Sequence, residues 1–151
     1  MKTILVGYDA SEAAARALDR AAELAEALTA RLFVVSVATT PFPAPAIEPT
    51  GPMLVPGRAI APEPEPQGDP TELAQRWLAE ARRKMAQRSL DADYVAEVGS
   101  PADQLLAVAD ERDADLIVVG SGDHGLLERL IAQPVEEAVA RRAQRDVLIV
   151  H

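Results

Sequence analysis

Short, continuous apolar runs alternate with helix-like stretches, and this alternation constrains the fold more than any other feature. Four runs, at residues 3–7, 32–37, 116–120 and 147–150, are rich in Val, Ile and Leu and do not alternate with polar residues. Strands of this composition are covered on both faces, as in a parallel sheet. Residues 93–98 alternate more, and we expect them to form a fifth strand nearer an edge.

Helical apolar stripes lie between these runs. The first extends from about residue 11 to residue 28, where apolar residues recur every three or four positions. A later stripe follows Pro101, a residue suited to the first turn of a helix. The order of strands and helices predicts an α/β fold with a doubly wound five-stranded parallel sheet. The three later stripes are marked by Leu73, Trp77, Leu78, Ala81 and Met85, by Leu105, Leu106 and Ala109, and by Val135, Ala138 and Val139.

A proline-rich stretch separates the second predicted strand from the second helix. Ten of the 12 prolines fall between residues 41 and 70. Proline removes backbone donors and favours extended chain. At 151 residues the chain has the length of one domain, so we interpret residues 39–70 as a surface excursion within a single domain of residues 1–151. A lid or docking segment is the alternative, with apolar contacts from Met53, Leu54, Val55 and Ile60.

Composition excludes several classes of function. A net charge of −9 argues against nucleic acid and anionic membrane surfaces, because both require clustered Lys and Arg. The chain has no cysteine and two histidines, so we expect neither thiolate chemistry nor a metal site. The first apolar run is too short for a signal peptide or a membrane span, and we therefore expect a cytoplasmic protein.

The predicted sheet brings three segments together at one edge. Ligands of open parallel sheets bind beyond the carboxyl ends of the strands, where the strand order reverses. Residues 7–11, 36–38 and 120–125 follow or end strands there. Only the last is a glycine-rich turn from a strand to a helix, and such turns direct backbone N–H groups at an anion. The crevice between these segments is therefore the candidate ligand site.

Four stretches carry a family resemblance: TILVGYDASEAAARAL, LFVVSV, EVGSPADQLLAVADERDADLIVVGS and PVEEAVARRAQRDVLIV. Within them, GSPADQLL and DADLIVVGS are the most specific. On these residues the chain resembles the universal stress protein family over essentially its whole length. The resemblance implies an adenine-nucleotide alpha hydrolase-like fold with strand order 3-2-1-4-5 and a regulatory, stress-response role. It also implies a homodimer paired through Val147–Val150, an apolar strand that would otherwise be an unguarded edge.

The resemblance also implies a test for ATP binding. Members that bind ATP carry a turn written Gly, two residues, Gly, nine residues, Gly, then Ser or Thr. On this sequence the pattern falls on Gly120, Asp123, Gln133 and Pro134, so only the first glycine matches. A carboxylate about 4 Å from a phosphate costs roughly 4 kcal/mol at an effective dielectric of ~20. Gln133 loses the freedom of glycine, and Pro134, which suits the first turn of the final helix, lacks both N–H and hydroxyl.

The adenine side of the family's site is retained at two positions. Asp9 matches the acidic residue near the polar groups of the nucleotide, and Val37 matches the apolar residue beside adenine. Structural interpretations stay open for both. Asp9, with Glu12 three residues later, resembles a capping box at the start of the first helix, and Val37 fits plain strand core.

A shifted turn is a further alternative on the phosphate side. Gly122 and Gly125 form a Gly, two residues, Gly turn displaced by two positions. Protonated His124 could meet a phosphate as a cation, although a loop histidine is commonly just solvated. Gly120, Ser121, Gly122 and His124, with Asp9 and Val37, thus make up the candidate nucleotide site.

Two main functions and one lesser alternative follow. The leading hypothesis is a dimeric stress protein with weak or lost ATP binding that acts through protein contacts and needs no cofactor. The alternative is an ATP- or AMP-binding member, using ATP with Mg²⁺ through an altered phosphate loop. We expect no catalytic residues, because no Ser–His pair has motif spacing. Asp9 and Asp123 could instead hold a divalent cation through oxygen ligands.

Overall fold

The computed structural model describes residues 1–40, 68–122 and 134–151. Most of the proline-rich segment, with its lid or docking interpretation, lies outside the described residues. Within these ranges the five predicted strands form one parallel sheet in the order β3-β2-β1-β4-β5, as predicted. The elements are β1 (Thr3–Gly7), α1 (Glu12–Leu28), β2 (Arg31–Ala38), α2 (Pro70–Met85), β3 (Ala92–Val98), α3 (Pro101–Glu111), β4 (Leu116–Gly120), α5 (Val135–Arg142) and β5 (Asp146–Val150).

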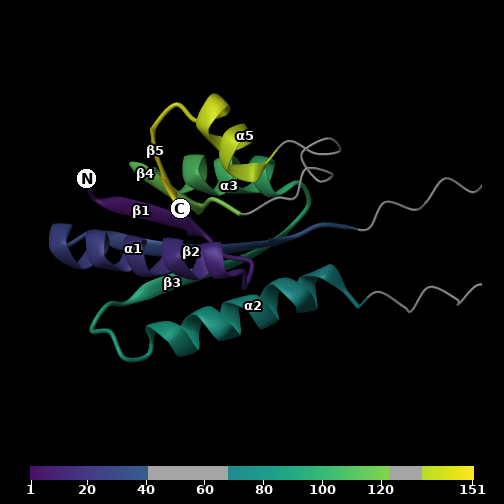
Figure 1. Cartoon of the computed structure of the whole chain (residues 1–151), viewed down its shortest axis with the longest axis horizontal. Coiled ribbons are helices and arrows are strands. Elements are labelled where there is room, and N and C mark those ends of the chain that lie inside the picture. The colour runs from purple at the N-terminus through teal and green to yellow at the C-terminus, as the bar shows by residue number, and fades with distance from the viewer. Residues whose placement is uncertain (41–67, 123–133) are drawn as a thin grey trace, which may run out of the picture.

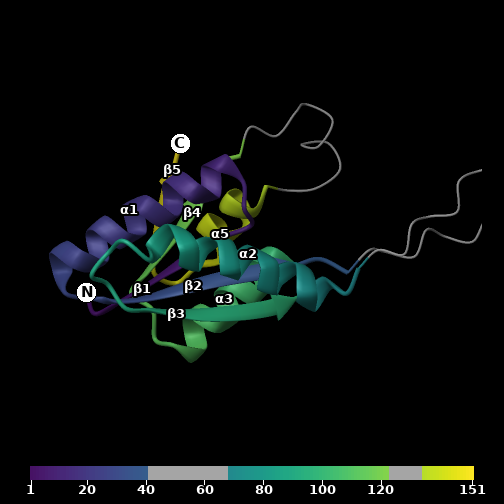
Figure 2. The same cartoon turned by 90° about the horizontal axis from the view of Figure 1, so that it is seen from below.

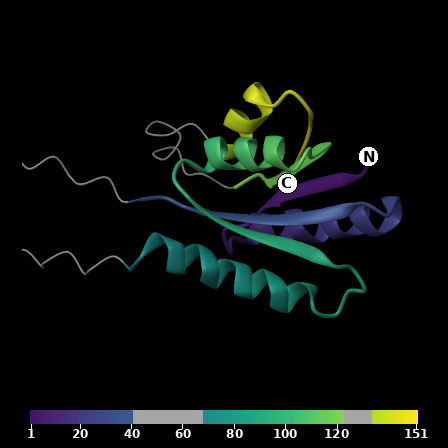
Figure 3. The same ribbon diagram turned by 180° about the vertical axis from the view of Figure 1, so that it is seen from behind.

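Helices cover both faces of the sheet, as the continuous apolar strands require. Figure 1 shows α3 and α5 on one face and α1 and α2 on the other, and Figure 3 shows the same layers from behind. One core joins α1 and α2 to side chains such as Ile4, Val6 and Val34. The other joins α3 and α5 to Leu5 and Val35. Successive residues of each central strand thus supply opposite cores, because side chains alternate along a strand.

Local signals fix the ends of the helices that lead to the candidate site. At the start of α1, Ala14 N–H donates to Ser11 Oγ at 3.1 Å, so Ser11 is the N-cap. The helix ends at Thr29, whose φ of 53° is in the left-handed region. Helix α3 begins at Pro101, as predicted, since proline lacks only an N–H that is unpaired there anyway.

The edges of the sheet are β3 and β5 (Figure 2). The edge position of β3 was expected from its alternating sequence. At the other edge, Ser121 N–H donates to Val150 O at 2.7 Å, which extends the pairing of β4 with β5. Arg145, just before β5, donates from Nη1 to Ala109 O and Ala114 O, both at 2.7 Å. The end of α3 is therefore bound to the chain that enters β5. None of the helices in the described ranges is long and apolar enough to cross a membrane.

Candidate functional site

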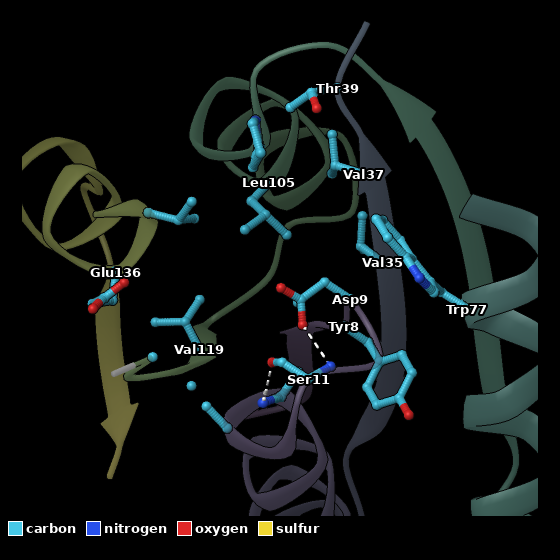
Figure 4. Close-up of a pocket in the computed structure, with 17 residues that line it drawn as sticks. Tyr8, Asp9, Ser11, Val35, Val37, Thr39, Trp77, Leu105, Val119 and Glu136 are labelled. Carbon is cyan, nitrogen blue, oxygen red and sulfur yellow. Dashed lines mark hydrogen bonds between the residues drawn. The ribbon is translucent and has the colours of Figure 1, made fainter. Parts of the chain in front are cut away.

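A cavity of about 460 Å³ opens at the carboxyl end of the sheet, where the sequence predicted a crevice. Its walls come from the ends of β1, β2 and β4 and from the first turns of α1, α3 and α5, with Trp77 added from α2 (Figure 4). Strand order reverses at β1, so the chain leaves β1 and β4 toward opposite faces and opens this space. Most of its lining is apolar, including Val35, Val37, Leu105, Val119 and Val135.

Asp9 lies at the cavity, exposed, between β1 and α1. Its Oδ1 accepts a hydrogen bond from Ser11 N–H at 3.0 Å, while its other oxygen points into the cavity (Figure 4). The capping-box interpretation of Asp9 is wrong, because Ser11 occupies the N-cap and bonds the third residue of α1. Asp9 instead forms a turn just before the helix, in which its side-chain oxygen accepts a hydrogen bond from the N–H of the residue two positions later. This local bond holds the carboxylate at the cavity.

Val37 lies both in the core and at the cavity, so its two interpretations coexist. The direction of its backbone N–H and C=O follows from the hydrogen bonds of neighbouring residues in β2. Tyr8 N–H donates to Val35 O, and Gly99 N–H donates to Ala38 O, so alternate residues of β2 face β1 and β3. Val37 faces the β1 side, yet the β1–β2 register ends at the Gly7–Val35 pair. The N–H and C=O of Val37 are therefore directed past the end of β1, toward the cavity.

Tyr8 fixes the cavity floor to its neighbours. Ser36 Oγ donates to Tyr8 O at 2.6 Å, and the Tyr8 hydroxyl donates to Glu80 on α2 at 2.7 Å. Burial, then the hydrogen bond to Glu80, raises the pKa of the Tyr8 hydroxyl, which therefore stays a neutral donor. Strand β1, strand β2 and helix α2 are thus tied together where the cavity begins.

The glycine turn has one tightly enclosed position. At Gly120, a Cβ atom would lie 2.4 Å from both the carbonyl carbon and oxygen of Ala13, and 2.8 Å from Ala14 N. Gly120 therefore lacks a side chain because the first turn of α1 packs directly against it. Gly122 also lines the cavity, whereas Ser121 is not among the lining residues and donates its N–H to Val150 O.

The remaining phosphate-side predictions fall largely outside the described residues. His124, Asp123, Gly125 and Gln133 all lie in residues 123–133. Pro134 is described, and its placement corrects the prediction. It stands at the N-cap position before α5, with φ −53° and ψ 140°, rather than in the first turn of the helix.

The charged residues among the described lining are both acidic. They are Asp9 and Glu136, and no Lys or Arg appears in the described part of the lining. A wall of this kind suits an apolar ring with hydroxyl or amine donors better than a chain of phosphates. The hydroxyl of Ser11 already accepts the Ala14 N–H, so it serves the helix.

Comparison with known proteins identifies the family of this chain. The model of the universal stress protein family matches residues 1–151. The chain belongs to the universal stress protein family. It is thus a stress-response protein with a UspA-like sequence and the α/β nucleotide-hydrolase-like fold of its structural neighbours.

Three relatives show how far the similarity extends. Stress response protein NhaX of Bacillus subtilis is 32% identical over 162 residues, covering 97% of this chain and 96% of its own. Universal stress protein Rv1636 of Mycobacterium tuberculosis H37Rv is 34% identical over 153 residues, covering 99% and 96%. A crystal structure of a universal stress protein in complex with cAMP is 30% identical, covers 99% of this chain and 97% of its own, and has a TM-score of 0.68.

Sequence reasoning missed Trp77 and Glu80 as residues of this region. In the sequence, Trp77 continues the apolar stripe of α2 and cannot be told from a core position. Glu80 is one of two acidic residues on α2, and nothing in the local sequence distinguishes it from a solvated surface residue. Their connection with the cavity arises because α2 packs beside β2 and β3, which the local pattern does not reveal.

Proposed function

We propose that this stress-response protein binds an adenine nucleotide with a single phosphate group, such as cAMP or AMP, in the cavity, and binds ATP weakly or not at all. The observation that supports this most is an apolar cavity whose described charged groups are carboxylates. Its volume of about 460 Å³ lies within the ~300–1,000 Å³ that small-molecule sites occupy. The relative in complex with cAMP supports the same ligand class.

The adenine side of the proposal rests on Val37 and Asp9. A backbone N–H beside a backbone C=O offers one donor and one acceptor, which complement the ring nitrogen and exocyclic amine of adenine. Val35 and Leu105 give the base apolar surface to cover. Asp9, with one oxygen toward the cavity, would accept a hydrogen bond from a ribose hydroxyl.

The phosphate side explains the preference for few phosphates. ATP brings several negative charges toward Asp9 and, in the sequence, toward Asp123. Each close like-charge contact is unfavourable by a few kcal/mol before screening. A single phosphate near Gly122 meets fewer of these carboxylates. The role of Gly120, Ser121 and His124 in that contact is part of the proposal.

Calorimetry with cAMP, AMP and Mg-ATP tests the proposal directly. We expect binding of the first two and at least tenfold weaker binding of ATP. Replacing Asp123→Gly, Gln133→Gly and Pro134→Ser together should strengthen ATP binding, because the change restores the family's phosphate turn. Stoichiometric ATP released from the purified protein, or no binding of any of the three nucleotides, would reject the proposal.

Asp9 provides a sharper test of the site. Asp9→Ala should weaken cAMP binding by about tenfold, the loss expected for one charged hydrogen bond. Asp91→Ala is the matched control, since Asp91 is also exposed but precedes β3 at the opposite end of the sheet. Equal affinities in the two variants would remove Asp9 from the site.

We also propose that the protein acts as a cytoplasmic homodimer paired through β5, and through contacts with other proteins. The bond from Ser121 N–H to Val150 O shows that Val150 and Leu148 direct their backbone toward β4. Ile149 therefore directs its N–H outward. Ile149→Pro removes only that outer donor and should yield a folded monomer in light scattering, whereas Leu148→Pro, the control, breaks the ladder with β4. A dimeric Ile149→Pro variant would contradict this pairing.

A further inference from the structure

The half-buried side chain of Trp77, on α2, contacts both the hydrophobic core and the cavity. Part of it packs against the core formed by α1, α2 and the sheet, and part of it lines the cavity. Figure 4 shows the indole extending from α2 toward β2. Together with Tyr8, it supplies the aromatic surface among the described lining residues. An aromatic face at a cavity is a surface on which a flat base can stack.

The helix that carries Trp77 is held in place from the cavity floor. Glu80 lies three residues after Trp77, so both side chains are on the same face of α2. The 2.7 Å hydrogen bond from the Tyr8 hydroxyl to Glu80 ties that face to the end of β1. Tyr8 is in turn held by Val35 and Ser36 through backbone and side-chain bonds. The indole is therefore a positioned wall, which lowers the entropy that a ligand must remove on binding.

The lining residues follow one order across the cavity. In Figure 4, Trp77 and Val37 lie toward one side, Asp9 lies between, and Val119 and Glu136 lie toward the other. A nucleotide with its ribose at Asp9 and its phosphate toward the β4 turn would bring its base to the side of Trp77. In this orientation the edge of the base also lies where it can bond the backbone N–H and C=O of Val37.

We propose that Trp77 is a specificity-determining residue of this cavity, where its indole stacks on the base and favours purines over pyrimidines. The inference rests on the proposed nucleotide site and adds the residue that selects the base. A two-ring purine covers more of an indole than a one-ring pyrimidine, and stacking grows with that overlap. Trp77 thus acts together with Val37, whose backbone reads the edge of the same base.

Fluorescence and two variants test this role. Trp77 is the only tryptophan, so the tryptophan fluorescence of the protein reports on this side chain alone. Stacking of the cAMP base on the indole should change that emission. Trp77→Leu should weaken cAMP binding about tenfold, in line with base–aromatic stacking, and should reduce the preference for cAMP over cyclic CMP. Trp77→Phe keeps an aromatic face and should retain most of the cAMP affinity and most of the preference for cAMP over cyclic CMP. Circular dichroism checks that the variants are folded.

Different outcomes separate this inference from the proposed function. If wild-type protein binds none of the nucleotides in calorimetry, the proposed function and this inference both fall. If wild-type protein binds cAMP but Trp77→Leu has the same affinity and the same purine preference, only the role of Trp77 is refuted. Calorimetric cAMP binding without any change in Trp77 emission refutes it too, and that measurement needs no variant.

Discussion

Gly120→Ala is expected to destabilise the whole fold, although Gly120 lies at the candidate ligand site. The added Cβ would stand 2.4 Å from two backbone atoms of Ala13 and 2.8 Å from Ala14 N. Carbon atoms prefer separations of about 3.5 Å or more, so the first turn of α1 must move by about 1 Å. No flexible side chain absorbs the clash, because all three atoms belong to the backbone of α1.

The expected cost is about 2 kcal/mol of unfolding free energy. Overpacking a tight site costs typically about 1–3 kcal/mol. Moving the first turn also disturbs the Ser11 cap, whose loss costs about 1 kcal/mol. Alanine restricts the unfolded chain and returns about 0.4–1 kcal/mol. The sum is a substantial part of the stability of a domain this size.

Urea unfolding followed by far-UV circular dichroism measures this cost. With a slope of about 1–3 kcal/mol per molar urea, the midpoint should fall by roughly 1 M. Gly7→Ala is the matched control, since its Cβ would meet the tip of the Leu105 side chain at 3.2 Å, and a side chain can turn away. If Gly120→Ala is no less stable than Gly7→Ala, the packing argument is refuted.

Three further substitutions test other contacts by urea unfolding. Arg145→Ala should cost about 2 kcal/mol, because it removes two hydrogen bonds from a charged group and leaves Ala114 O without that partner, although Ala109 O keeps its bond from Ala114 N–H. The exposed Arg141→Ala should change stability by less than ~0.5 kcal/mol, and equal effects would contradict the role of Arg145 in binding the end of α3. Tyr8→Phe should cost about 1 kcal/mol, and an unchanged midpoint would mean that the bond to Glu80 adds nothing. Hydrogen bonds from the N–H groups of Lys2 and Thr3 lower the pKa of the Asp115 carboxyl in the folded protein. The ionised carboxylate therefore stabilises the fold above the pKa that Asp115 has in the unfolded chain, and this stabilisation is lost as the pH falls through the lower, folded-state pKa. Asp115→Asn should flatten that acid dependence, and an unchanged pH profile would count against it.

Much of the fold was predictable because its signals are local. The apolar runs at 3–7 and 116–120 gave the central strands, and the strand order 3-2-1-4-5 implied by the family resemblance is confirmed. Asp9 shows the limit of this approach. Its spacing to Glu12 fits a capping box, but Ser11 competes for the same helix end and occupies it. Choosing between two possible N-caps two residues apart depends on the backbone path out of β1, which sequence spacing does not contain.

The sequence by itself determined the layers, the strand order through its family resemblance, and the carboxyl-end position of the cavity, because apolar runs and glycine turns are local instructions. Only the tertiary structure decided which side chains share that cavity. Trp77 joins Val37 because α2 packs across the sheet, and Gly120 must stay bare because α1 lies against it. Both facts depend on contacts between segments far apart in the chain, and periodicity along one segment carries no record of its neighbours in space.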